Sequence, residues 1–271
     1  MKYINIQSRS VPALGFGTWQ LRGDTCIDSV ADAIEIGYRH IDTAQMYENE
    51  EAVGKAIAMS GVPRDELFVT TKLGLGELTP DSVRRTTCQS LDRLRLKYVD
   101  LLLIHWPDES VPLDETIGAM NALRDEGMIR HVGVSNFTPT LVDEAAQHAQ
   151  LFCNQVEYHP LLSQARMREK ARSMGFMLTA YSPLARGNAF DKPVIKELAK
   201  AHNKHPAQIV LRWLIQQEHV AAIPRASSSH HRRSNFDIFN FELDDDQMRR
   251  ISELGGDQRL IDPEWAPAWE R

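Results

Sequence analysis

Short apolar runs rich in Val, Ile and Leu alternate along the chain with longer segments of helical periodicity. Eight runs are predicted as strands: PALGFGTW (12–19), YRHID (38–42), LFVTTK (67–72), VDLLLIH (99–105), IRHVGVSN (129–136), CNQVEY (153–158), FMLTAYSP (176–183) and VAAIPR (220–225). Runs such as VDLLLIH are apolar on both faces, as in a parallel sheet that helices cover on each side. The helical segments between them begin after Ser, Thr, Asp or Pro and many end at Gly, which is typical of helix boundaries. The pattern predicts a βα unit repeated eight times.

Eight βα units within 271 residues favour a closed barrel. A doubly wound open sheet is the alternative, but no GxGxxG follows any predicted strand, and GLGEL (74–78) is too short for that fingerprint. Alternating residues in 1–11 predict a hairpin before the barrel, and 193–217 holds two helical patterns where one would suffice. We therefore predict an α/β protein: a (β/α)8 TIM barrel with an N-terminal β-hairpin and extra helices, forming a single domain over residues 1–271.

Composition and charge narrow the classes of partner. The net charge is −6, with both signs interspersed, so neither nucleic acid nor an anionic membrane is an expected partner. No apolar run approaches the ~20 residues of a membrane span, and the first ten residues do not resemble a signal peptide. Cys26, Cys88 and Cys153 fit neither a disulfide framework nor a CxxC metal site. We expect a cytoplasmic monomer without a metal.

Polar residues lie where the predicted strands end, and in a (β/α)8 barrel those ends build the active site. They are Asp42, Lys72, His105, Ser135, Asn136, Gln155, Glu157, Tyr181, Ser182 and Arg225, with Tyr47 just past the second strand. Taken singly, each has an ordinary explanation, such as a helix cap or a core histidine. Together, however, an Asp, a Tyr, a Lys and a His arise on successive strands. The sequence therefore predicts that their side chains meet at one mouth of the barrel.

The motifs that carry these residues resemble those of the aldo-keto reductase family. GFGTW, HIDTAQMYENE, the TK that ends at Lys72, LLLIHWP, GVSNF, NQVEYHP, YSPLARG and IPR match the family in order and spacing, essentially from end to end. The chain looks most like the small bacterial members near the 2,5-diketo-gluconate reductases. The resemblance implies an enzyme that uses NAD(P)H to reduce aldehydes, ketones or keto sugars, such as methylglyoxal or 2,5-diketo-gluconate, to alcohols.

The resemblance also implies a catalytic role for each of the four ionisable residues. A free phenol has a pKa of about 10, so a tyrosine that exchanges protons near neutrality needs a neighbouring cation. By this reasoning Tyr47 is the proton donor, Lys72 stabilises its phenolate and lowers its pKa, and Asp42 holds the lysine. His105 is expected to hydrogen-bond the substrate carbonyl and orient it for hydride attack.

The remaining predicted site residues follow from the same resemblance. Those expected to hold the cofactor are Ser135, Asn136 and Gln155 at the nicotinamide carboxamide, Tyr181 stacked on its ring, Ser182 and Leu184 at the pyrophosphate, and Arg225, His231 and Asn235 at the adenosine end. Trp19 and Trp106 are expected to wall the substrate pocket. No metal ligand is expected.

The last motif departs from the family pattern. Relatives commonly carry a Lys and a Ser after the IP, then an Arg six residues beyond the Lys, to bind the 2′-phosphate of NADP(H). Arg225, Ala226 and His231 occupy those positions here. Since an imidazole is only partly charged at neutral pH, NADP(H) is the expected cofactor, with NAD(H) as the alternative. Arg232 and Arg233 are interpreted as solvated residues at a helix start.

A second departure is Gly74, where relatives often carry a tryptophan two residues after the lysine. One side of the pocket is therefore expected to be open, which would widen the range of carbonyl substrates. The tail that bears Trp265 and Trp269 either closes part of this gap or forms a strap along the barrel.

Two other functions remain as alternatives. The first is a metal-dependent barrel hydrolase that uses His40, Asp42, His105 and His159. The second is a noncatalytic nicotinamide-binding sensor or regulatory subunit on the same fold, because a fold alone does not fix a function.

Overall fold

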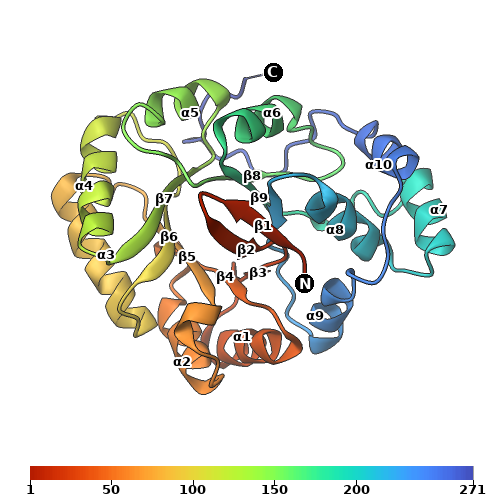
Figure 1. Cartoon of the computed structure of the whole chain (residues 1–271), viewed down its shortest axis with the longest axis horizontal. Helices are drawn as coiled ribbons and strands as arrows, with labels where there is room; N and C mark the ends of the chain where they lie inside the picture. Colours follow the sequence, from red (N-terminus) through yellow and green to blue (C-terminus); the bar gives the residue numbers. More distant parts are fainter. Residues whose placement is uncertain (271) are drawn as a thin grey trace.

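The protein forms a barrel of parallel strands surrounded by helices (Figure 1), and the computed structural model describes residues 1–270. The eight strands are β3 (Phe16–Gly17), β4 (His40–Asp42), β5 (Phe68–Leu73), β6 (Val99–Ile104), β7 (Ile129–Ser135), β8 (Cys153–Glu157), β9 (Met177–Tyr181) and β10 (Val220–Ala222). Each pairs in parallel with the next along the chain. A parallel bridge between Leu14 and Ala222 joins the first and last strands, so the sheet closes on itself. The predicted (β/α)8 barrel is confirmed.

Helices follow the strands and cover the outside of the sheet (Figure 1). They are α1 (Gly23–Ile36), α2 (Glu50–Met59), α3 (Pro80–Leu94), α4 (Leu113–Asp125), α5 (Pro139–Ala145), α6 (Ala165–Met174), α7 (Pro193–Ala201), α8 (Pro206–Gln216), α9 (Ser229–Phe236) and α10 (Asp245–Ser252). Side chains of Thr79 and Thr138 cap α3 and α5, each followed by Pro at the first helical position. The successive helices α7 and α8 confirm the extra helical pattern predicted in 193–217.

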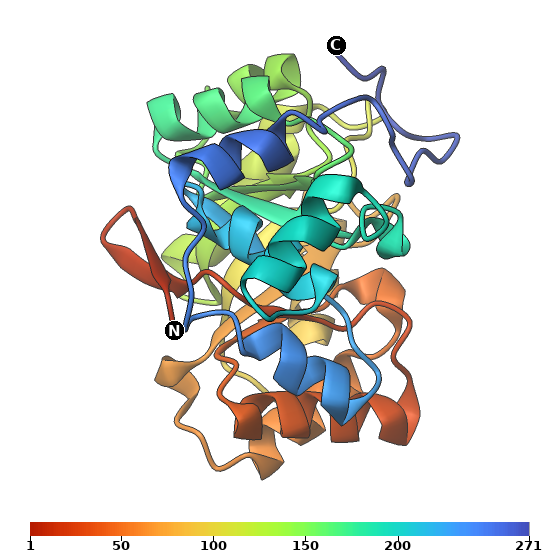
Figure 2. The ribbon, with the colours of Figure 1, turned by 90° about the vertical axis from the view of Figure 1, so that its right-hand side faces the viewer.

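An antiparallel hairpin precedes the barrel, as predicted. It consists of β1 (Tyr3–Ile6) and β2 (Arg9–Pro12), joined by Gln7 and Ser8, whose φ angles of 47° and 66° suit a tight two-residue turn. Buried apolar residues of both strands face the barrel. The hairpin lies over the end of the barrel opposite the C-terminal tail (Figure 2). It therefore covers the end at which no active site is expected.

The core explains why the strand prediction was reliable. Every residue of β5 and β6 is buried, because the barrel interior lies on one side and helices on the other. Strands buried on both faces need continuous apolar sequence, such as the run VDLLLIH. No helix in the described part of the chain is long and apolar enough to cross a membrane.

Candidate active site

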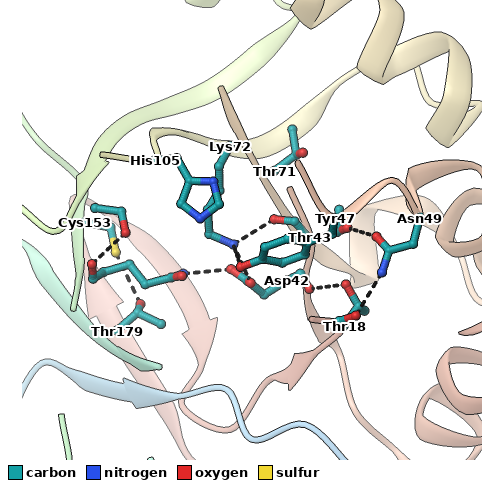
Figure 3. A network of polar contacts seen from close by, with 12 residues as sticks. Thr18, Asp42, Thr43, Tyr47, Asn49, Thr71, Lys72, His105, Cys153 and Thr179 are labelled. Carbon is teal, nitrogen blue, oxygen red and sulfur yellow. Dashed lines mark hydrogen bonds and ion pairs between the residues drawn. The ribbon is translucent and has the colours of Figure 1, made fainter. Parts of the chain in front are cut away.

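A buried ion pair lies at the carboxyl ends of two neighbouring strands (Figure 3). Lys72 on β5 places its Nζ atom 2.6 Å from Oδ1 of Asp42, the last residue of β4. The ammonium also donates to the carbonyl oxygen of Thr43 at 2.8 Å. The other carboxylate oxygen accepts a hydrogen bond of 2.7 Å from Nε2 of Gln155 on β8. Both charges are thus removed from water and satisfied by protein groups, as burial of charge requires.

Tyr47 joins this pair from the loop after β4. It ends the 3-10 helix η1 (Gln45–Tyr47), and its hydroxyl lies 3.3 Å from Nζ of Lys72. Its ring packs edge-on against Trp19 and His105, with centroid distances of 4.9 and 5.6 Å. The structure therefore brings together the four ionisable residues that the sequence indicated, Asp42 and Lys72 among them.

Residues that were not singled out in the sequence hold the loop that carries Tyr47. Asn49 accepts a hydrogen bond of 2.7 Å from the hydroxyl of Thr43, and its amide donates to the carbonyl oxygens of Thr18 and Leu21. Asn49 is buried, so these bonds are shielded from water. The only sequence signal for this role was the place of Asn49 inside the quoted motif HIDTAQMYENE.

The pKa of Tyr47 is shifted in the direction opposite to the sequence expectation. Burial and the carboxylate of Asp42 raise the pKa of Tyr47 well above its usual value, and the nearby Lys72 does not reverse this. Burial also lowers the pKa of Lys72, although Asp42 opposes the shift. The phenol is therefore protonated at neutral pH, which is the state that a proton donor requires.

His105 is a neutral imidazole at the same mouth. Burial and the charge of Lys72 lower its pKa well below the usual value for histidine. Its Nδ1 atom is buried, with no hydrogen-bond partner among residues 1–270. The residue follows β6 directly, as predicted, and it packs against the ring of Tyr47. A neutral ring of this kind can donate one N–H to an uncharged oxygen.

A set of amide and hydroxyl groups borders the ion pair on the far side. Asn136 donates to Oγ of Ser135 and to the carbonyl oxygen of His105, and its Oδ1 accepts a hydrogen bond of 2.7 Å from the hydroxyl of Tyr181. Asn136 has a φ of 62°, a left-handed conformation that asparagine tolerates. The predicted carboxamide residues are therefore neighbours, and their mixed donors and acceptors suit an amide ligand.

Gln155 was expected to contact only the nicotinamide carboxamide, but its Nε2 atom donates a hydrogen bond to the carboxylate of Asp42. It therefore links the predicted carboxamide residues to the ion pair. Ser182 and Leu184 follow β9 in the expected loop, where Ser182 adopts a positive φ of 46°.

The predicted adenosine residues lie around the start of α9. Arg225 and His231 are exposed, whereas Ala226 and Asn235 are buried. Arg225 forms no ion pair with any residue from 1 to 270, so its guanidinium is available to an anion. It lies just before the N-terminus of α9, where Ser228 caps the helix. A free cation beside a helix N-terminus fits a phosphate group.

The interpretation of Arg232 as a solvated residue is wrong. Its side chain is buried and donates to Asp32 on α1 at 2.5 Å, to Ser29, and to the carbonyl oxygens of Ala226 and Ser227. Asp32 lies far away in the sequence, so the partner that allows this arginine to be buried could not be recognised from the run HHRR. Arg233 on the same helix is exposed, as expected.

Aromatic side chains border part of the barrel mouth, where the substrate pocket is expected, and a cavity lies beside Gly74. Trp19 is exposed against Tyr47, while Trp106 is buried and packs against Trp269 of the tail. A cavity of about 350 Å³ lies beside Gly74. Its lining residues are Gln45, Met46, Gly74, Leu75, Glu77, Thr86, Gln89 and Arg93, none of them from the tail. The tail therefore contacts one wall of the mouth and leaves the space beside Gly74 open.

A buried carboxylate anchors this tail. Glu157, at the end of β8, accepts hydrogen bonds from the backbone N–H groups of Leu260 and Ile261 at 2.8 and 3.0 Å, and from Nε2 of His159 at 2.9 Å. The sequence indicated Glu157 as a polar strand end without giving it a role. Nothing in the sequence around Glu157 indicated that it binds the backbone of residues about a hundred positions further along the chain.

The ligand set of the hydrolase alternative is not assembled. His159 bonds Glu157, and Nδ1 of His40 faces the carbonyl oxygen of Pro12 in the hairpin. Within residues 1–270 no three His, Cys, Asp or Glu side chains are grouped so that they could hold a metal ion. The cysteines are free thiols, and burial raises the pKa of Cys153 to about 12.

The fold and the site together define a class of protein: a (β/α)8 barrel enzyme with a protonated phenol, an ammonium and a neutral imidazole at its mouth. Comparison with known proteins gives the family. A model described as the aldo/keto reductase family matches residues 13–255. The chain belongs to this family.

Relatives cover nearly the whole chain. A methylglyoxal reductase DkgB of Escherichia coli O157:H7 is 40% identical over 267 residues, which cover 96% of this chain and 100% of that protein. A solved structure assigned as 2,5-diketo-D-gluconic acid reductase B aligns with a TM-score of 0.97 and 40% identity, covering 100% of this chain and 98% of the other. A Bombyx mori aldo-keto reductase in complex with NADP aligns with a TM-score of 0.89 and 32% identity, covering 96% and 95%. The protein is therefore an oxidoreductase that reduces carbonyl groups.

Proposed function

We propose that the protein reduces small aldehydes, ketones and keto sugars to alcohols with NADPH as the preferred cofactor and NADH as a second one. Methylglyoxal and 2,5-diketo-gluconate are the proposed substrates, because the relatives at 40% identity are named for these compounds. One observation carries the mechanism: the hydroxyl of Tyr47 lies 3.3 Å from the ammonium of Lys72 at the barrel mouth.

In this proposal a nicotinamide cofactor held at the barrel mouth would supply the hydride that the carbonyl carbon receives. Tyr47 then gives its proton to the carbonyl oxygen, and the O–H bond of the phenol breaks as the O–H bond of the alcohol forms. Lys72 stabilises the resulting phenolate, since its ammonium lies within hydrogen-bond distance. Asp42 keeps that ammonium charged in a site where burial favours its neutral form. His105 donates an N–H to the carbonyl oxygen and orients the substrate.

The cofactor would be held by residues on four strand ends and one helix. Ser135, Asn136 and Gln155 would bind the carboxamide, and Tyr181 would stack on the nicotinamide ring. The remaining proposed contacts are Ser182 and Leu184 at the pyrophosphate and Arg225, His231 and Asn235 at the adenosine end. An NADP-bound relative supports NADP(H) as the cofactor. Trp19 and Trp106 would contact the substrate.

The decisive experiment is steady-state kinetics of the wild type and Tyr47→Phe with both substrates and both cofactors. Wild type should consume NADPH with either carbonyl compound. Tyr47→Phe should lose turnover by about 100- to 10,000-fold, because it removes the proton donor, while the dissociation constant of NADPH stays the same. Full activity of this variant would disprove the acid assignment. Binding of NADPH without turnover in the wild type would favour the noncatalytic alternative.

We further propose that the chain acts as a single-domain monomer in the cytoplasm. The single eight-stranded barrel supports one domain, and the three free thiols suit a reducing compartment such as the cytoplasm. Size-exclusion chromatography with light scattering would test the oligomeric state, and a mass of twice the 30.8 kDa chain would contradict it.

A further inference from the structure

The side chain of Gln45 connects the two segments that carry Tyr47 and Lys72. Its Oε1 atom accepts a hydrogen bond of 2.7 Å from the backbone N–H of Gly74. Its Nε2 atom donates to Oγ of Ser90 on α3 at 3.1 Å. Gln45 lies two residues before the tyrosine, and Gly74 lies two residues after the lysine. One amide side chain therefore ties both loops to each other and to a helix.

A second connection lies on the other side of the tyrosine. Oε1 of buried Glu50 accepts a hydrogen bond of 2.6 Å from the hydroxyl of Thr71, the residue before Lys72. The other carboxylate oxygen of Glu50 accepts from Nε of Arg93 at 2.8 Å. Arg93 in turn donates to Oγ of Ser90, which also binds Gln45. The loop of the tyrosine is thus fastened to β5 both before and after the residue.

The connection through Gln45 spans a gap in the packing. A cavity of about 350 Å³ is lined by Gln45, by Gly74 and by Met46, the residue before Tyr47. Few side chains therefore press on this face of η1, and a three-residue 3-10 helix has little stability of its own. A Cβ atom on Gly74 would lie 3.4 Å from Oε1 of Gln45, an ordinary van der Waals contact, so the hydrogen bond itself does not require a glycine here.

We propose that Gln45 is a positioning residue for the reaction: by holding the N–H of Gly74, it fixes the phenol of Tyr47 against the ammonium of Lys72. This inference rests on the proposed roles of those two residues. Displacement of a reacting group by about 1 Å can lower a rate by roughly 100-fold. The hydroxyl of Tyr47 lies 3.3 Å from Nζ of Lys72, so a further displacement of about 1 Å would break this hydrogen bond.

Three variants test the proposal. Gln45→Met keeps the length of the side chain but removes both hydrogen bonds. Gln45→Glu keeps an oxygen that can accept from Gly74 N–H. Gln89→Met is the matched control, because Gln89 lines the same cavity and its side chain makes no hydrogen bond within residues 1–270. Gln45→Met should lower kcat about 10- to 100-fold with an unchanged KM for NADPH, whereas Gln45→Glu and Gln89→Met should stay within about threefold of the wild type.

The pH profile of the reverse reaction gives an independent measurement. Oxidation of an alcohol needs the phenolate of Tyr47, so its kcat rises as the phenol loses its proton. Greater separation from Lys72 removes a charge that favours the phenolate, and it therefore raises the pKa of Tyr47. In Gln45→Met the rise of kcat should move to higher pH, and in Gln89→Met, which changes no charge, it should stay near the wild-type position.

Two outcomes would overturn the proposal. One is wild-type kcat in Gln45→Met. The other is an equal loss in Gln45→Met, Gln45→Glu and Gln89→Met together with a lower melting temperature, which would show a general effect on the cavity. Tyr47→Phe, measured alongside, distinguishes the two hypotheses. If that variant is fully active, the proton donor is wrongly assigned, whatever the Gln45 variants show.

Discussion

The carboxylate of Glu157 holds the backbone N–H of Ile261, a residue 104 positions further along the chain. This bond fastens the C-terminal tail at the end of β8, close to the strand end that carries Tyr181. Further along the tail, Trp269 packs against Trp106, the residue after His105. A buried acid thereby determines where an aromatic side chain of the tail meets the proposed substrate wall.

Replacing Glu157 by Gln should loosen this tail. The amide presents an N–H where the carboxylate accepted one, so a backbone donor of the tail loses its partner, at a cost of about 1–3 kcal/mol. The KM for methylglyoxal or 2,5-diketo-gluconate should rise about fivefold, while the dissociation constant of NADPH does not change. Glu169→Gln, an exposed acid on α6, is the control. Equal KM values in the two variants would mean that the docked tail does not shape the substrate pocket.

The buried pair of Asp42 and Lys72 allows stability to be separated from catalysis. Lys72→Met leaves an unpaired buried carboxylate and should lower the free energy of unfolding by about 3–5 kcal/mol. The double variant Asp42→Asn/Lys72→Met has no buried charge at this position and should recover most of that loss. Its kcat should nevertheless remain about 100-fold or more below the wild type, because no cation stabilises the phenolate. Chemical denaturation and steady-state kinetics on the same samples would measure both quantities. Recovery of activity in the double variant would contradict the role of the lysine.

The pH dependence of carbonyl reduction should respond to Asp42. In the proposed mechanism the reduction needs the Tyr47 phenol protonated and the Lys72 ammonium charged, so kcat should fall at alkaline pH as either proton is lost. Asp42 raises the pKa of both groups. Removing its charge in Asp42→Asn should therefore lower both pKa values and move the alkaline fall of kcat to lower pH. A profile of kcat from neutral pH upwards for the wild type and this variant would show the shift. An unchanged or upward-moved limb would be incompatible with the proposed electrostatics.

Cofactor preference should depend on the exposed His231. If this side chain helps to bind the 2′-phosphate, the ratio of kcat/KM for NADPH to that for NADH should respond to the charge at this position. His231→Arg should raise this ratio, because a guanidinium is permanently charged and can bind a phosphate through two hydrogen bonds. His230→Arg adds the same charge one residue away and should have a smaller effect. An unchanged ratio in His231→Arg would reject this role.

The sequence predicted the barrel because each strand is buried on both faces and must be apolar throughout. The alternation of VDLLLIH-like runs with capped helices left few other arrangements, and the hairpin was recognisable from alternation alone. Boundaries were less accurate: the first predicted strand covered 12–19, whereas β3 is Phe16–Gly17, because residues before it pair irregularly to close the ring. The bridge that closes the ring pairs Leu14 with Ala222 of the last strand, and a contact between such distant residues cannot be predicted from local sequence.

The proposed catalytic groups could be predicted because they lie at strand ends, where the fold itself brings them together. Their surroundings could not. The burial of Arg232 depends on Asp32 in a different helix, and the pKa of Tyr47 depends on how deeply the loop packs. The bond from Gln45 to Gly74 could not be predicted either, because the sequence marked Gly74 only as a departure from the family pattern and gave Gln45 no role. Each of these features is a contact between distant segments, which periodicity and spacing do not determine.

The hairpin at one end of the barrel and the tail at the other have a practical consequence for fusion proteins (Figure 2). An affinity tag or fluorescent partner joined before Met1 would emerge next to the hairpin, on the side away from the reacting groups. The same partner joined at the C-terminus would be attached close in sequence to Trp269 and would compete with the docking of the tail. Fusions at the start of the chain should therefore preserve turnover better than fusions at its end.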